Sequence, residues 1–185
     1  ETVLVNDLLY SSFSKINQTV NGLITDYQLL IRNTNSSSEN SDTFKEGDDQ
    51  KLLSTFMFGT KLPLKKKNQK TVKLLTPKFL ARYSPNATKN NSNWSESINY
   101  NNIFSLDRID DTAVEGGGSL TFGVEYFSSI EDKKSFNLSL ANIMRINKNS
   151  DLPDVYGFSQ KRSDFIGELG YSPSKFFDLN YQFSL

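Results

Sequence analysis

The last segment of the chain alternates apolar and polar side chains without exception. Its residues run Phe177, Asp178, Leu179, Asn180, Tyr181, Gln182, Phe183, Ser184 and Leu185. A period of two is that of a β-strand, whose successive side chains point to opposite faces, whereas a helix needs apolar residues three and four apart. The same period recurs over residues 119–126 and 135–140. The sequence therefore predicts an all-β chain whose strands each have one apolar face.

Continued along the chain, this alternation predicts about eight strands, each about as long as a tilted strand needs to cross a bilayer. They are expected near residues 2–13, 22–33, 51–64, 71–84, 117–128, 134–146, 162–172 and 175–185. Pro77 cannot donate to a ladder and predicts a bulge or a strand end. Ile143 and Ile146 are out of phase with the residues before them, which predicts a bulge or an early strand end after Ala141.

The connections alternate in length. Short turns are expected at 14–21, 65–70, 129–133 and 172–174, and long polar loops near 34–50, 85–116 and 147–161. An up-and-down transmembrane barrel has this form, with short periplasmic turns and longer extracellular loops. We therefore predict that residues 1–185 form a single partial outer-membrane β-barrel domain of antiparallel strands. A secreted β-sandwich used for adhesion is the soluble alternative, because alternation suits its sheets as well.

The composition excludes several classes of function. Lys and Arg equal Asp and Glu at 21 each, so no net charge would attract nucleic acid. The chain has no Cys and no His, which removes thiolate ligands, the commonest metal ligand and the usual general base. We expect no metal, no cofactor and no catalysis, and an outer-membrane hydrolase is a poor alternative. The three lysines at 65–67 are expected in a solvated turn rather than in a binding patch.

Polar residues on the face opposite the apolar one are expected to line the lumen of the barrel. They are Asp26, Lys78, Arg82, Glu125, Asp164, Glu168, Asp178 and Asn180. A charged, hydrated interior suits a polar passage. The solvent face of a soluble sheet would look the same, and no pair among them has the spacing of a catalytic or metal-binding site.

Three stretches together carry a family resemblance. Residues 76–83 form a Pro-containing strand, residues 101–110 contain Leu-Asp-Arg-Ile after an Asn-rich and Phe-containing approach, and residues 119–126 contain Leu-Thr-Phe-Gly. Their order and spacing resemble the barrel domain of the LptD family of lipopolysaccharide-assembly outer-membrane proteins, also called organic solvent tolerance proteins. The resemblance covers about the C-terminal three fifths of the chain.

This resemblance implies a non-enzymatic barrel in the outer membrane of a Gram-negative bacterium, much larger than eight strands, of which this chain is an open part. Such a barrel is plugged by the lipoprotein LptE and passes lipopolysaccharide from periplasmic bridge proteins into the outer leaflet. A generic porin or receptor barrel, which would share the strands but lack the central loop motif, is the alternative.

The resemblance also carries over one pair of loop residues, Asp107 and Arg108. Arg offers a planar fork of donors and Asp can accept from loop backbone, so the pair is expected to pin the long central loop. A direct contact of Arg108 with a sugar phosphate is the functional alternative.

Overall fold

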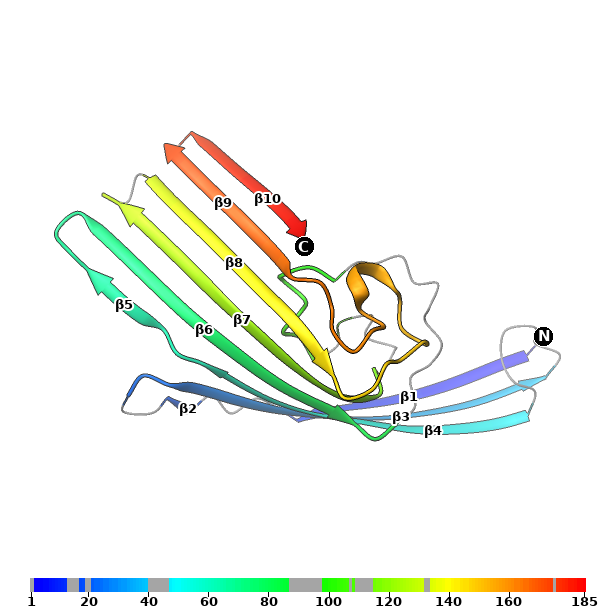
Figure 1. Ribbon diagram of the computed structural model, residues 1–185. Coiled ribbons are helices and arrows are strands. Elements are labelled where there is room, and N and C mark those ends of the chain that lie inside the picture. The colour runs from blue at the N-terminus through cyan, green and yellow to red at the C-terminus, as the bar shows by residue number, and fades with distance from the viewer. Residues whose placement is uncertain are drawn as a thin grey trace.

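The computed structural model describes residues 2–12, 17–18, 21–39, 47–86, 98–106, 108, 115–131, 134–174 and 176–185. Within these ranges the chain forms one curved antiparallel sheet, with loop segments on its concave side (Figure 1). In sheet order its main strands are β1 (Thr2–Ser12), β3 (Ile24–Glu39), β4 (Gly47–Lys61), β6 (Thr71–Ser84), β7 (Gly117–Ile130), β8 (Lys134–Arg145), β9 (Ile166–Ser174) and β10 (Phe177–Ser184). Short strands β2 (Asn17–Gln18) and β5 (Leu64–Lys67) pair with β3 and β6, and η1 (Val155–Gly157) is a single 3-10 turn. The predicted up-and-down, all-β architecture is confirmed.

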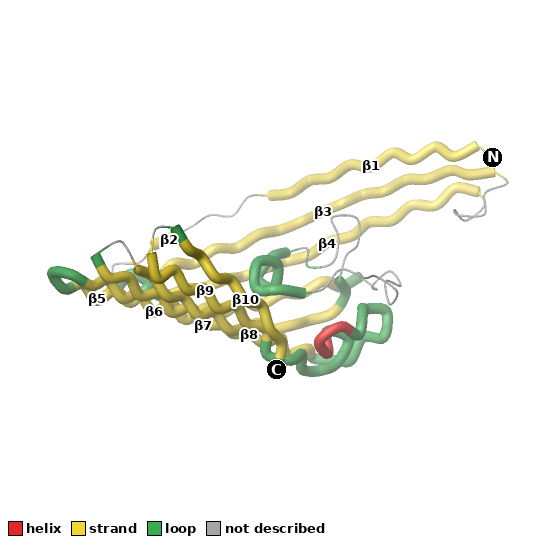
Figure 2. The backbone as a smooth tube through the Cα atoms, turned by 90° about the horizontal axis from the view of Figure 1, so that it is seen from above, coloured by secondary structure: helices red, strands yellow, loops and turns green. Residues whose placement is uncertain are grey.

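The sheet does not close on itself. Among the described residues β1 pairs with β3 alone and β10 with β9 alone, and these two strands lie at opposite edges (Figure 2). The expected open sheet is therefore confirmed. The described part of the chain contains no helix that is both long and apolar enough to cross a membrane.

The strand register separates apolar from polar residues. Residues directly opposite one another on neighbouring strands share a face. One such row joins Val124, Leu140, Gly167 and Phe183, and the next row, on the other face, joins Glu125, Ser139, Glu168 and Gln182. The second face carries the loops, so it is the inner, concave face, and the first is the outer face. This confirms the predicted period along β7 to β10.

Two strands are longer than the sequence indicated. β3 continues to Glu39 and β4 begins at Gly47, so residues 34–39 and 47–50, expected in a loop, belong to the ladder. Residues 34–38 read Thr-Asn-Ser-Ser-Ser and are polar on both faces, so no alternation marks them as a strand. Pairing with β1 and β4 nevertheless satisfies their backbone groups and carries these strands beyond the rest of the sheet (Figure 2).

The structure also differs from the prediction at residues 65–67 and at the start of β9. Lys65, Lys66 and Lys67 are in β5 rather than in a turn, because they pair with Leu74, Lys73 and Val72. β9 begins at Ile166 rather than near residue 162. Residues 162–165 follow the loop instead, where the N–H of Ser163 donates to the carbonyl of Ile143 at 2.9 Å.

Pro77 lies opposite a break between β4 and β5, and its own strand, β6, is continuous. β6 stays paired with β7 through Pro77, so the predicted bulge or end in that strand is wrong. On its other side β6 pairs with β4 up to Lys61 and with β5 from Leu64. The gap lies opposite Pro77, which has no N–H to donate there and only accepts a hydrogen bond from Leu62 N at 3.1 Å.

Of the two isoleucines behind the predicted bulge or strand end, only Ile143 is out of phase; Ile146 has the same parity as Leu140 and lies beside Gly118 and Tyr83 on the outer face. β8 keeps its register with β7 through Arg145, so it has no bulge, and only its pairing with β9 ends at Ala141. Ile143 lies on the inner face with 1% exposure. The inner face turns apolar there because loops pack against it.

Candidate functional site

The two long connections of the C-terminal half fold back onto the inner face and form a small core there. Its buried residues are Ile98, Tyr100 and Ile103 before β7, Leu152 and Phe158 between β8 and β9, and Ala141, Ile143 and Ile166 on the strands. Phe104 packs against this core and lies over Gly123 of β7. A Cβ atom on Gly123 would stand 2.5 Å from Cζ of Phe104, so any side chain at this position would displace the ring.

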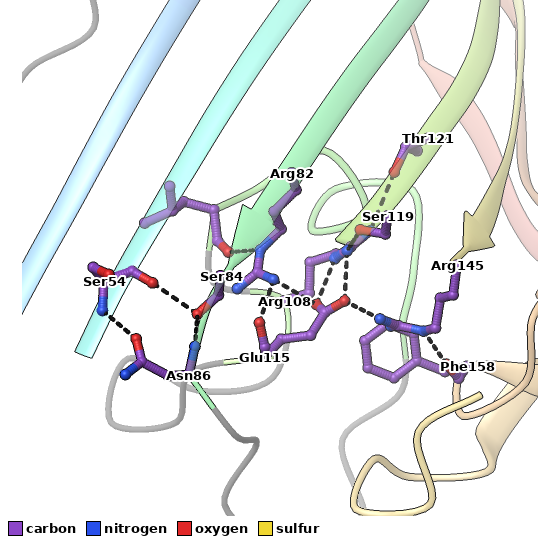
Figure 3. A network of polar contacts seen from close by, with 11 residues as sticks. Ser54, Arg82, Ser84, Asn86, Arg108, Glu115, Ser119, Thr121, Arg145 and Phe158 are labelled. Atoms are coloured by element: carbon purple, nitrogen blue, oxygen red, sulfur yellow. Dashed lines mark hydrogen bonds and ion pairs between the residues drawn. The ribbon is translucent and has the colours of Figure 1, made fainter. Parts of the chain in front are cut away.

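A buried ion cluster lies beside this core (Figure 3). The register places Arg82 of β6 and Arg145 of β8 on either side of Ser119 on the inner face. Glu115 is 1% exposed and forms an ion pair with Arg145, while Oε2 of Glu115 lies 3.8 Å from Arg82 Nη1. Arg108, which comes from the central loop, forms a third ion pair with Glu115. One carboxylate is thus shared by three guanidinium groups.

Arg108 is fully enclosed by this cluster. Its Nε and Nη2 donate to the two carboxylate oxygens of Glu115 at 2.9 and 2.7 Å, the bidentate geometry that Arg favours. It also donates to the hydroxyls of Ser119 at 2.7 Å and Thr121 at 3.1 Å. Its side chain is 0% exposed. Arg108 therefore joins the central loop to β7.

The other two arginines hold loop backbone. Nε of Arg82 donates to the carbonyl of Leu106 at 2.9 Å, and Nε of Arg145 donates to the carbonyl of Phe158 at 2.7 Å. The Arg145 guanidinium also lies 4.3 Å from the centroid of the Phe158 ring. Both connections are thereby tied to the strands beneath them.

The charge of Glu115 is strongly stabilised. Burial alone would raise the pKa of this carboxyl, but the charges of Arg108, Arg82 and Arg145 outweigh burial and lower it to about 2. Glu115 is therefore ionised at neutral pH.

A second polar cluster lies further along the inner face. Lys78 of β6 and Glu125 of β7 form an ion pair, and the hydroxyl of Tyr100 donates to Oε1 of Glu125 at 3.2 Å. Nζ of Lys78 lies 5.6 Å from the ring centroid of Tyr100 and 5.1 Å from that of Phe104. Burial, and then the charge of Glu125, raise the pKa of Tyr100, which keeps its hydroxyl as a donor.

The inner face thus carries a fixed arrangement of charges and folded loops, and the outer face does not. Residues 8–185 match the family described as LptD: LPS transport system D. The chain belongs to the LptD family. No curated protein matches it significantly. Membership of this family gives the chain a role in lipopolysaccharide transport.

Most of the polar residues that the sequence predicts to line the lumen lie on the inner face of this LptD-family chain. The register aligns Asp26 with Leu80 across Gly59, and Glu168 with Glu125 across Ser139. Lys78 and Arg82 share this face, and on the edge strand Asn180 lies opposite Gly170, with Asp178 two residues away on the same parity. Asp164 is different, because it lies before β9, is exposed, and donates its N–H to the carbonyl of Tyr156 at 2.9 Å.

The loop motif is described in part. Asp107 lies outside the described residues, whereas Arg108 enters the ion cluster. The sequence reasoning missed Glu115 and Arg145, which complete that cluster. No local signal marks Glu115, since the partners Arg108, Arg145 and Arg82 are 7, 30 and 33 positions away. Within the described ranges no group of three or more potential metal ligands occurs.

A groove on the inner face lies beside the second cluster. It has a volume of about 370 Å³. Its walls include the apolar side chains Ile24, Met57, Leu80 and Phe104 and the charged side chains Asp26, Lys61 and Lys78. In the LptD-family chain this groove is where the inner face offers apolar surface next to charge.

Proposed function

We propose that this chain is part of an outer-membrane barrel that moves lipopolysaccharide into the outer leaflet, without catalysing a reaction. The observation that carries the proposal is the arrangement of its two faces. Large apolar side chains are exposed on the outer face, while the inner face holds the buried and half-buried ion pairs and the loops. A soluble protein would bury its apolar face, so this arrangement suits a sheet whose outer face meets lipid.

The outer face has the apolar surface that a bilayer requires. Phe56, Phe122 and Leu179 are 49%, 44% and 48% exposed, and further exposed large apolar residues on this face are Tyr27, Leu29, Leu64, Leu75, Tyr83, Leu120, Met144, Tyr171 and Tyr181. On β7, Gly118 pairs with Tyr83 and Tyr126 lies eight residues further on. Eight strand residues span about 27 Å, or about 20 Å along the normal at a tilt of about 40°. Tyr83 and Tyr126 would thus stand near the two borders of the hydrocarbon, as interfacial aromatics do.

The open edges support a barrel larger than these strands. β1 and β10 each have one partner within the described residues. An unpaired strand edge in hydrocarbon leaves backbone groups unsatisfied at a cost of several kcal/mol each. We therefore propose that residues 1–185 are a single partial barrel domain whose edge strands pair with further strands.

The connections give the proposed orientation. At one end of the sheet, called here the turn end, β4 leads to β6, β7 to β8 and β9 to β10. The described residues 98–106, 115–116 and 146–165 lie at the other end, the loop end (Figure 1). In the outer membrane of a Gram-negative bacterium the turn end would face the periplasm. There, by resemblance to the family, periplasmic bridge proteins would deliver lipopolysaccharide.

The inner face would then line the lumen, with Asp26, Lys78, Arg82, Glu125, Glu168, Asp178 and Asn180 as polar lining residues. The lipoprotein plug LptE, a partner implied by the family, would lie against this face, where the groove beside Lys78 offers apolar surface to a partner side chain. For Arg108 we propose loop pinning rather than a sugar-phosphate contact, since its side chain is fully buried and its donors contact Glu115, Ser119 and Thr121.

A pair of arginine substitutions on β8 tests this function. Leu140 lies on the outer face opposite Val124, whereas Asn137 lies on the inner face opposite Gly170. In the full-length protein, Leu140→Arg should destabilise the barrel by about 2–4 kcal/mol if it lies near the midplane of the bilayer. Asn137→Arg places the same charge in the polar interior and serves as the matched control.

The expected result is loss of surface lipopolysaccharide, and entry of large antibiotics, in cells that depend on the Leu140→Arg protein, with near-normal behaviour for Asn137→Arg. Equal effects of the two substitutions would contradict a lipid-facing outer face. Normal surface lipopolysaccharide in cells that lack the protein would contradict the transport role itself.

A further inference from the structure

The turn end of the sheet carries lysines on its apolar outer face. β5 pairs with β6 so that Leu64 lies opposite Leu75 and, two residues nearer the turn, Lys66 lies opposite Lys73. Leu75 also pairs with Tyr126, an outer-face residue, so Lys66 and Lys73 share the outer face as well. Both lysines are exposed. The last apolar pair of these two strands is therefore followed directly by a pair of ammonium groups.

Two like charges directly opposite one another on a sheet repel each other. Among the described residues no carboxylate forms an ion pair with Lys66 or Lys73, although the nearby Lys70 is paired with Glu131 at 3.2 Å. Lys134, exposed and opposite Ile130, adds a third ammonium group to the same face on β8, three strands away from β5. An anion between these side chains would relieve the repulsion.

The position of these lysines identifies the source of that anion. They stand just beyond the apolar surface formed by Leu64 and Leu75, which are 49% and 41% exposed. Lysine stems can lie along such a surface while their ammonium groups reach the polar layer of a membrane. In that layer the anions are phospholipid headgroups. We propose that Lys66 and Lys73 bind an anionic phospholipid headgroup at the turn end of the sheet.

This site rests on the proposed function, because it requires the outer face to meet lipid. It extends that function, since it would fix the depth and tilt of the β5–β6 hairpin in the leaflet opposite to the one that receives lipopolysaccharide. A lysine near an anionic surface contributes about 1 kcal/mol, which corresponds to about a fivefold change in affinity. Two lysines should therefore account for about a 25-fold preference for an anionic over a zwitterionic phospholipid.

The experiment compares lipid binding by the full-length protein and two double variants in detergent micelles, with native mass spectrometry to count bound lipids. Lys66→Gln with Lys73→Gln removes the proposed site. Lys148→Gln with Lys161→Gln removes the same charge from exposed lysines in the connection at the loop end and is the matched control. The probes are phosphatidylglycerol, phosphatidylcholine and inorganic phosphate.

We expect the first double variant to bind phosphatidylglycerol about 25-fold more weakly, with phosphatidylcholine unchanged, no competition from inorganic phosphate and no change in the control. Equal phosphatidylglycerol binding by all three proteins would overturn the proposal, and competition by inorganic phosphate would show a free-anion site instead. Insertion into phospholipid vesicles is measured in parallel. A protein that inserts but shows no lysine-dependent binding refutes this site alone, whereas a protein that does not insert refutes the proposed function as well.

Discussion

Replacing Glu115 by glutamine should let the connections before β7 and between β8 and β9 open away from the inner face. The substitution keeps the shape of the side chain but removes the charge shared by Arg82, Arg108 and Arg145. The pKa of Glu115 lies at about 2 in the folded chain against 4.5 for a free carboxyl. At about 1.4 kcal/mol per pKa unit, this difference corresponds to about 3 kcal/mol of stabilisation of the folded chain by the Glu115 charge. Removal of one member of a buried ion pair has a cost of similar size, about 3–5 kcal/mol.

Limited proteolysis of the full-length protein measures this effect, because cleavage of a rapidly opening loop follows the population of the open form. The connection between β8 and β9 offers trypsin two exposed lysines, Lys148 and Lys161. A loss of about 3 kcal/mol should raise their cleavage rate about 100-fold. Glu131→Gln is the matched control, because its pair with Lys70 is exposed and worth at most about 1 kcal/mol. Cleavage of Glu115→Gln at the rate of this control would refute the view that the cluster holds the loops.

Because the folded pKa of Glu115 is depressed, its stabilisation should be complete above about pH 4.5 and be lost as the pH falls toward 2; a loop cleavage rate, measured with an acid-stable protease, that stays constant across this window would contradict the pKa. Gly123→Val should displace the Phe104 ring and expose residues 98–106 to hydrogen exchange, and unchanged exchange there would show that the ring does not need the glycine. An epitope tag after Ser150 should be reachable on whole cells and a tag after Asn68 should not, and the reverse labelling would invert the orientation.

Much of the strand pattern is visible in the sequence. The strand predicted at 71–84 coincides with β6, and those near 117–128 and 134–146 differ from β7 and β8 by two residues or fewer. Side-chain alternation succeeds there because one face is apolar and the other polar, so the local period reflects the environment of the strand. At 34–39 both faces are polar, and the ladder is held by backbone groups that leave no mark on the side-chain pattern.

The inner site is only partly visible from the sequence, because its contacts are not local. Arg108 was found through its loop motif and Arg82 through the period of its strand. Glu115 stands next to a glycine triplet with no periodic neighbour, and Arg145 lies where the inner face has already turned apolar. What brings them together is the folding of two long connections onto the same side of the sheet, and that packing is decided by tertiary contacts rather than by any single segment.

Spin labels on β7 and β8 show whether the outer face of this sheet meets lipid. The chain has no Cys, so single cysteines introduced into it label one position of this chain at a time. In the full-length protein in lipid vesicles, labels at Val124 and Leu138 should collide preferentially with oxygen, which dissolves in lipid, and labels at Glu125 and Asn137 with a water-soluble nickel complex. Equal access of the nickel complex to all four positions would contradict a lipid-facing outer face, because it would show a sheet with water on both faces.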